Sequence, residues 1–323
     1  MLDSLDTLTA PPNSLRGSFI WHFFGEHMAI PESQLDTWSH QGSVTQSSET
    51  YQTIRRALLA DDSGYADKAF DVFLQGSYGN DTNIYAESDV DIVICLNSTF
   101  RYNTDSLSAP EKAAYGAYVG AATYTIDEFK TAVTAQLRRC FGDNAVTVGE
   151  KALRIKSDNN RRSSDVVVCY EYRGYKSFSP SNTSDYKPGI IFPTASGEII
   201  NYPKHHSANL TTQHQATSNM LKPMVRILKN MRSRLVRDGL IMTGVAPSYY
   251  VEGSFFNVPT EEYVSTSFGD TFSNGVNWLI KADKSKLVCA NWQYYLLGNL
   301  NVQWTSEKYT QFLTALVKQW NDW

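Results

Sequence analysis

The stretch Phe73-Leu-Gln-Gly-Ser-Tyr-Gly-Asn-Asp-Thr-Asn-Ile-Tyr-Ala-Glu-Ser-Asp-Val-Asp-Ile-Val-Ile-Cys-Leu96 joins two apolar runs through a polar loop. Both runs have the length and apolar content of buried strands. Because side chains alternate between the two faces of a strand, Asp89 and Asp91 should point the same way. Val90 and Ile92 should then point the other way, into a core. The stretch therefore predicts two strands of one sheet, with paired carboxylates at the start of the second.

The residue types in the loop indicate chemistry on a phosphate. Two adjacent carboxylates repel each other unless a cation lies between them, and Mg²⁺ is a hard cation that takes oxygen ligands. Gly76 has no side chain, so an anion can approach the backbone N–H groups there, and the Ser77 hydroxyl can donate as well. These features predict a phosphate-binding turn facing a metal-binding carboxylate pair. A plain turn with two solvated aspartates is the alternative.

The spacing from Gly76-Ser77 to Asp89-x-Asp91 resembles the signature of the nucleotidyltransferase superfamily typified by DNA polymerase β. The fuller wording, Gly-Ser-Tyr-x-Asn-x-Thr-Asn-Ile followed by Ser-Asp-Val-Asp-Ile-Val, is similar to the bacterial cGAS/DncV-like nucleotidyltransferases. The resemblance implies an α+β fold with a polymerase β-like catalytic lobe, a mixed sheet with helices, at residues 1–200. A helical lobe at residues 201–323 would complete the nucleotide cleft. N-terminal helices, including one predicted at residues 19–28, should span both lobes.

A third carboxylate is expected at Asp165, which stands at the start of the β-branched strand 164–172 as Asp89 stands at the start of its own. A hairpin could bring it beside the other two, and the Ser-Asp-Val-Val-Val wording is similar to that of the family. The resemblance implies that Asp89, Asp91 and Asp165 hold two Mg²⁺ ions, for which Mn²⁺ can substitute. The alternative is a strand-initiating aspartate that faces water.

Residues in the C-terminal half are expected to bind the nucleotide. The resemblance implies that Lys229 contacts the triphosphate, whereas the other basic residues of the same helix are interpreted as a solvated face. Ser248 and Tyr249 match the phosphate-binding serine and the base-stacking tyrosine of the family. The alternative is a helix that starts at Ser248 and buries its tyrosines.

Other segments carry weaker signals. Residues 174–197 are rich in Ser, Pro, Gly and Asn and predict an exposed loop, and His205 and His206 just beyond are interpreted as loop histidines. Aromatic-rich helices are predicted within 260–282, 288–298 and 304–323. In the last of these the apolar positions keep helical spacing to the end of the chain, which predicts a docked end and makes C-terminal conjugation to a target unexpected.

Composition limits the function further. The 323 residues carry 42% hydrophobic and 19% charged residues with a net charge of −4, which is typical of a globular protein and gives no support for an extended nucleic-acid surface. The four cysteines are dispersed, so reduced thiols are expected rather than a zinc site. The start resembles no signal peptide and no run of about 18 apolar residues occurs. A cytoplasmic protein without membrane contact is therefore expected.

The resemblance implies in-line attack on the α-phosphate of a nucleoside triphosphate, with at least one purine substrate, followed by ring closure. The product would be a cyclic di- or trinucleotide that serves as a second messenger in anti-phage signalling of the CBASS type. A downstream effector would bind that product. The alternatives are a template-independent polymerase that makes linear oligonucleotides or tails RNA, an enzyme that transfers a nucleotide to a protein or small molecule, and an inactive nucleotide-binding regulator.

Overall fold

The computed structural model describes residues 30–42, 44–85, 89–195 and 197–323. The predicted helix at residues 19–28 lies outside these ranges. The described chain forms two compact units: a sheet unit made of residues 44–79 and 89–204, and a helical unit made of the rest. Residues 30–42 and 80–85 thus belong to the helical unit.

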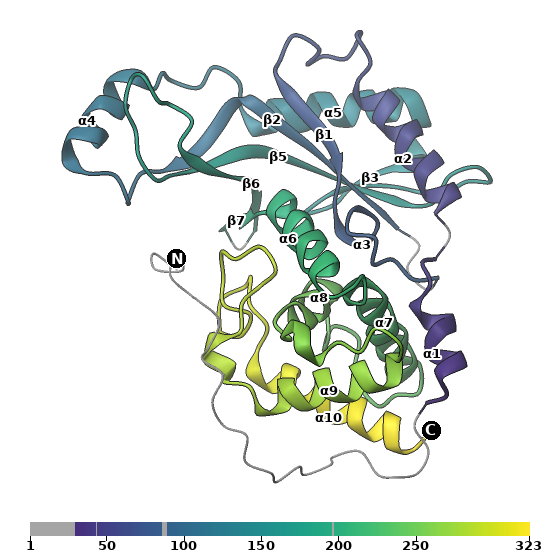
Figure 1. Ribbon diagram of the computed structural model, residues 1–323. Helices are drawn as coiled ribbons and strands as arrows, with labels where there is room; N and C mark the ends of the chain where they lie inside the picture. The colour runs from purple at the N-terminus through teal and green to yellow at the C-terminus, as the bar shows by residue number, and fades with distance from the viewer. Residues whose placement is uncertain (1–29, 43, 86–88, 196) are drawn as a thin grey trace. The chain divides into compact units, whose positions relative to one another are not determined.

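One mixed sheet forms the sheet unit (Figure 1). Its strands are β1 (Phe70–Leu74), β2 (Val90–Asn103), β3 (Val146–Val148), β4 (Leu153–Ile155), β5 (Ser164–Tyr175), β6 (Tyr186–Thr194) and β7 (Gly197–Asn201). The order is β1-β2-β5-β4-β3, with β6 paired to β5 and β7 paired to β6. β2 and β5 run parallel, whereas the other pairs are antiparallel.

Helices α2 (Thr45–Leu58) and α5 (Ile126–Phe141) cover one face of this sheet (Figure 1). The predicted burial of Val90, Ile92 and Ile94 is confirmed, and Val93 and Cys95 of the same strand are also buried, in a separate small cluster. The helix α5 begins with a capping box, in which Thr125 and Glu128 satisfy each other's backbone N–H groups. The shorter helix α4 (Ala109–Tyr118) begins with a similar box and packs on a small aromatic cluster of its own.

The sheet contains more strand than the sequence predicted. β2 continues to Asn103, beyond the apolar run that ends at Leu96, and β6 occupies residues 186–194 within the stretch predicted as exposed loop. In β6, Ile190 and Ile191 are buried against the sheet. Pairing with β5 therefore outweighs the turn-forming composition around β6.

The helical unit is built around one apolar core. Its helices are α1 (Glu32–Ser39), most of α6 (Pro203–Ala216), α7 (Leu221–Arg237), α8 (Ser248–Phe256), α9 (Phe268–Lys281) and α10 (Ser306–Asn321). The helix predicted within 288–298 is not formed. Those residues are irregular and make isolated β-bridges, such as Val288 with Tyr295. In the described ranges, no helix is both long and apolar enough to cross a membrane.

Aromatic side chains fix the last helix. The ring of Trp320 stacks on Phe272 at a centroid distance of 4.3 Å, and the ring of Trp323 meets the edge of Trp38 at 5.4 Å. The Arg234 guanidinium lies 4.0 Å from the centroid of the Trp323 ring. The predicted docking of this helix is therefore confirmed.

Candidate active site

The parallel pairing of β2 with β5 sets two of the predicted carboxylates side by side. Asp91 lies directly opposite Asp165 in this register, so the two side chains share one face of the sheet. Asp89 immediately precedes β2 and accepts a hydrogen bond from the hydroxyl of Ser163, which immediately precedes β5. The three aspartates thus lie at the start of two neighbouring strands. The hairpin partner of β5 is β4, so the parallel pairing with β2, rather than a hairpin, brings Asp165 to Asp91.

The turn before β2 is shaped around Asp91. Gly76 begins the short helix α3 (Gly76–Gly79), which also carries Ser77, and has a φ of +64°. A Cβ atom placed on Gly76 would lie 2.2 Å from the Oδ2 atom of Asp91. The backbone N–H of Gln75 donates to the carbonyl of Asp91 at 3.0 Å. Glycine is therefore required here both by the left-handed backbone and by the carboxylate against it.

Arg154 neutralises the carboxylates, and the sequence analysis missed it. It lies opposite Asp165 in the β4–β5 register. Its guanidinium is 3.1 Å from Asp89 and 3.7 Å from Asp165. Burial raises the pKa of Asp165 above its usual value, the Arg154 charge opposes that rise, and the Asp89 charge adds to it. The signal in the sequence was an arginine at the centre of a three-residue strand, Leu-Arg-Ile, whose neighbours are buried.

The three carboxylates are suitable ligands for a hard divalent cation, although here the Arg154 guanidinium lies beside two of them. Within the described ranges, no three His, Cys, Asp or Glu side chains converge as a metal-holding group. Carboxylate oxygens at the start of two adjacent strands are nevertheless the ligands that Mg²⁺ takes. A bound cation would substitute for the charge of Arg154. Asp89, Asp91 and Asp165 therefore fit a metal site chemically once the arginine moves aside.

Replacing Arg154 with alanine is expected to tighten Mn²⁺ binding in the absence of nucleotide by roughly twofold to fivefold, the scale of an exposed ion pair. The reason is that the cation would no longer compete with the guanidinium. Titration calorimetry or Mn²⁺ electron paramagnetic resonance measures the affinity. Arg139→Ala removes a comparable exposed pair with Asp62 elsewhere in the sheet unit and should leave the affinity unchanged. Weaker Mn²⁺ binding in Arg154→Ala would contradict the assignment.

A small cavity of about 40 Å³ opens on the face of the sheet that carries the carboxylates. Cys95 follows Asp91 by an even number of residues on β2, and Glu171 follows Asp165 in the same way on β5. Because side chains alternate between the two faces of a strand, all four side chains share this face. The residues that line the cavity are Asp71, Phe73, Cys95, Asn97, Glu171, Pro188, Gly189, Ile190, Pro203 and Lys204.

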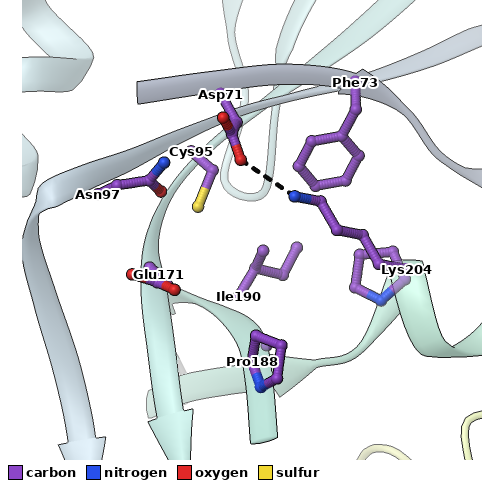
Figure 2. A pocket seen from close by; sticks show the side chains of 10 residues that line it. Asp71, Phe73, Cys95, Asn97, Glu171, Pro188, Ile190 and Lys204 are labelled. Carbon is purple, nitrogen blue, oxygen red and sulfur yellow. Dashed lines mark hydrogen bonds and ion pairs between the residues drawn. The ribbon is translucent and has the colours of Figure 1, made fainter. Parts of the chain in front are cut away.

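One exposed ion pair crosses this cavity. Figure 2 shows the Lys204 side chain reaching toward Asp71, with the ammonium 3.0 Å from the carboxylate. The same ammonium lies 4.8 Å from the centroid of the Phe73 ring. The cavity thus combines an aromatic ring with hydrogen-bonding groups of both charges.

Ser248 and Tyr249 lie together at the start of α8 in the helical unit. The guanidinium of Arg232 donates to the Ser248 hydroxyl at 2.9 Å and to the carbonyl of Ala246 at 3.1 Å. The ring of Tyr249 stacks on His206 at a centroid distance of 4.8 Å. A cation beside a hydroxyl at a helix start is a suitable site for an anion. His206 lies on α6, not in the loop that the sequence predicted.

Lys229 has a different place from the one expected of a triphosphate ligand. Its side chain is fully buried, and its ammonium lies 2.9 Å from Glu252 and 3.1 Å from the Thr82 hydroxyl. The direct phosphate contact that the sequence predicts stays a prediction, and the ammonium is here paired with an internal carboxylate. Glu252, which the sequence analysis did not single out, is the one charged residue in the aromatic α8 sequence SYYVEGSFF. A charge in such a sequence signals a buried pair.

The basic residues that precede Lys229 on α7 are not a solvated face. Lys222 is buried and donates to Asp81 at 2.9 Å. Arg226 donates to the carbonyl of Asp81 at 2.6 Å, and burial lowers the pKa of this arginine to about 10 despite the opposing charge of Asp81. These side chains hold the segment that precedes β2. Periodicity alone did not reveal this role, because the partners are distant in sequence.

Comparison with known proteins decides the family. Residues 208–321 match the model of the cGAS/DncV-like nucleotidyltransferase C-terminal helical domain. A cyclic nucleotide synthase of Staphylococcus haemolyticus is 36% identical over 302 residues, covering 92% of this chain and 100% of that protein. The chain belongs to the cGAS/DncV-like nucleotidyltransferase family. The cyclic UMP-AMP synthase of Rhodothermus marinus is 39% identical over 298 residues, covering 92% of this chain and 99% of that one.

Solved structures of cGAS/DncV-like nucleotidyltransferases agree with this fold. The Rhodothermus marinus c-UMP-AMP synthase, solved with Apcpp and Upnpp, has a TM-score of 0.82 at 38% identity and covers 91% of this chain and 97% of its own. The Elizabethkingia meningoseptica cyclic dinucleotide synthase, solved with GTP and Apcpp, has a TM-score of 0.71 at 28% identity, with coverage of 90% and 98%. The predicted α+β nucleotidyltransferase fold with a C-terminal helical domain is therefore confirmed.

Proposed function

We propose that this nucleotidyltransferase joins nucleoside triphosphates, at least one of them a purine nucleotide, into a cyclic dinucleotide or trinucleotide. Similarity to cyclic nucleotide synthases over more than nine-tenths of the chain supports the proposal. The observation that carries it is the register of β2 and β5, in which Asp91 lies opposite Asp165. The product would act in the cytoplasm as a messenger of anti-phage defence, and an effector would bind that product rather than the enzyme.

In this proposal the three carboxylates organise successive nucleotidyl transfers. Asp89, Asp91 and Asp165 would hold two Mg²⁺ ions, or Mn²⁺ in their place, which supply charge neutralisation for the triphosphate and a lower pKa for the attacking ribose hydroxyl. The hydroxyl attacks an α-phosphate in line and pyrophosphate leaves. A second attack, by a ribose hydroxyl of the linear product on its remaining α-phosphate, releases another pyrophosphate and closes a dinucleotide ring, and a trinucleotide takes one transfer more. Gly76 and Ser77 offer backbone and hydroxyl donors to the phosphates during each transfer.

Phosphate and base contacts from the helical unit are assigned to α7 and α8. We assign the triphosphate contact to Arg232, with Ser248 as its partner, because the guanidinium donates to that hydroxyl. Guanidinium groups bind phosphate through several donors at once. Tyr249 is assigned to stacking on a nucleobase, which its ring can do for any base. Lys229 is left out of this set because its ammonium is paired with Glu252.

Arg232→Ala is expected to raise KM for every accepted triphosphate by a similar factor, about 10- to 150-fold, because a charge-assisted hydrogen bond is lost. The triphosphate is common to all substrates, so base preference should not change. Steady-state kinetics with each NTP measures the effect. Arg237→Ala, an exposed residue on the same helix, is the control and should behave as wild type. A loss confined to one base would refute the assignment.

Product analysis tests the proposed function directly. The purified protein is incubated with all four NTPs and Mg²⁺ or Mn²⁺, treated with phosphatase, and the resistant product is identified by mass. A cyclic di- or trinucleotide supports the proposal. A ladder of linear oligonucleotides would instead identify a template-independent polymerase. The absence of any transfer, with NTP binding retained, would identify a nucleotide-binding regulator.

A further inference from the structure

The stretch that leads into β5 is bonded to the turn that carries Ser77. The guanidinium of Arg162 donates to the Tyr78 hydroxyl, with 2.8 Å between Nη1 and the oxygen. Tyr78 directly follows Ser77 within α3, and Arg162 lies shortly before Asp165. All of these residues belong to the sheet unit. A hydrogen bond from a charged group therefore connects the proposed phosphate-binding turn with the strand that carries the third carboxylate.

Arg162 is itself anchored on a third element, the helix α2. Its Nε atom donates to Oε1 of Gln46 at 3.2 Å, and its backbone N–H donates to the hydroxyl of Thr50 at 3.0 Å. Thr50 is fully buried, and its hydroxyl donates in turn to the carbonyl of Gln46 at 2.7 Å. Because the donors of a guanidinium form a rigid planar fork, these bonds determine where the donor to Tyr78 points.

The residue after Arg162 meets the first carboxylate. The hydroxyl of Ser163 donates to Asp89, and its carbonyl accepts from the backbone N–H of Val90 at 3.0 Å. β5 begins directly afterwards and brings Asp165 opposite Asp91. The start of β5 is therefore bonded to the carboxylates on both strands, and the bond from Arg162 to Tyr78 adds the turn to this arrangement.

α3 is too short to hold its own conformation, which gives this bond a consequence for catalysis. The helix consists of Gly76–Gly79, and so short a helix is unstable without contacts from outside it. Its first end is held where the backbone N–H of Gln75 donates to the carbonyl of Asp91 at 3.0 Å. Tyr78 provides a contact nearer the other end. A shift of about 1 Å in a catalytic group can lower the rate by about 10²-fold.

We infer that Arg162 and Tyr78 are positioning residues for the nucleotidyl transfer: their hydrogen bond sets the turn that carries Ser77 relative to Asp165. The catalytic readout of this role rests on the proposed function. Each side chain acts through a neighbour in the sequence, Tyr78 through Ser77 and Arg162 through the start of β5.

Tyr78→Phe tests this role, because phenylalanine keeps the ring and removes only the hydroxyl. We expect kcat to fall by roughly tenfold, the scale of one lost hydrogen bond to a charged group. KM for the NTPs should stay close to the wild-type value, because Ser77 and the backbone donors of the turn are still present. Amide hydrogen exchange in residues 76–79 should accelerate by a similar factor, since the turn would open more often.

A double-mutant cycle with Arg162→Met separates the pair from other effects of either residue. In the Arg162→Met protein the hydrogen bond is already absent, so adding Tyr78→Phe should lower kcat by less than about twofold. The matched control is Tyr118→Phe, the same substitution at an exposed tyrosine of α4. It should alter neither kcat nor the exchange in residues 76–79.

Wild-type kcat in Tyr78→Phe would overturn the inference, and faster exchange with an unchanged kcat would show that the bond is only structural. An equal loss of kcat in the Arg162→Met background would also overturn it, since the tyrosine would then act without the arginine. So would a raised KM at unchanged kcat, which would indicate direct contact with the substrate. If wild-type protein forms no product, the proposed function fails on its own, and the exchange in Tyr78→Phe still decides whether this bond fixes the turn.

Discussion

Asp89→Asn combined with Asp91→Asn is expected to lower the rate of product formation by about 10³-fold or more, while the fold persists. This loss of rate is larger than the loss caused by removing one preorganised hydrogen-bond donor from an active site. Asparagine keeps the shape of each side chain but removes the charges that would hold divalent cations. Asp91 would still fit against Gly76 because the amide has the same outline. Stability should change little, since the lost pair between Asp89 and Arg154 is exposed and one source of repulsion also disappears.

Single-turnover assays with Mg²⁺, together with thermal melting in EDTA, separate the loss of catalysis from the loss of fold. The matched control carries the same change at two exposed aspartates of the sheet unit, Asp61→Asn with Asp143→Asn. That protein should retain wild-type turnover. Near-normal turnover in the Asp89 and Asp91 double variant would contradict the assignment of these carboxylates as metal ligands, whatever the melting temperature of the variant.

The arrangement of Gly76, Asp89 and Asp91 was predictable because the signal for it lies within one short stretch of sequence. The spacing from Gly76 to Asp91 requires only a turn between two strands, and alternation along β2 then fixes which side chains face the core. The position of Asp165 needed more information. Its strand lies more than seventy residues later in the sequence, and the pairing of β5 with β2 depends on the whole sheet. Resemblance to a family supplied that step, which periodicity could not supply.

Other features were missed because their partners are distant or because pairing outweighed local preference. β6 lies in a stretch whose composition favours turns, yet Ile190 and Ile191 are buried where it pairs with β5. The stripe on α7 showed which positions are charged but not which carboxylate each one meets. Lys229 meets Glu252, which lies on the next helix, so the pattern along α7 alone could not indicate that the ammonium is buried.

The energetics of this buried pair lead to the second large expected effect. Lys229→Met alone should lower the free energy of unfolding by about 3–5 kcal/mol near neutral pH, because it leaves Glu252 buried without its cation. Adding Glu252→Gln to Lys229→Met should recover most of that loss, since no uncompensated charge remains. Chemical denaturation of the single and double variants measures both effects. Lys318→Met, which breaks an exposed pair with Asp322, is the control and should have little effect.

The pH dependence of the stability of the same variants tests independently whether Lys229 stabilises the charged form of Glu252. Burial by itself raises the pKa of Glu252, but the Lys229 charge and the hydrogen bonds from His206 and Thr82 outweigh it, so the folded pKa lies well below the usual value. The wild-type pair therefore contributes stability above the ordinary glutamate pKa of about 4.3 and loses it as the pH falls toward the folded value. In Lys229→Met the folded pKa of Glu252 should instead rise, so that stability decreases as the pH increases through it. A Lys229→Met protein as stable as wild type at every pH would show that the ammonium is not committed to Glu252, and would return Lys229 to the triphosphate contact first expected of it.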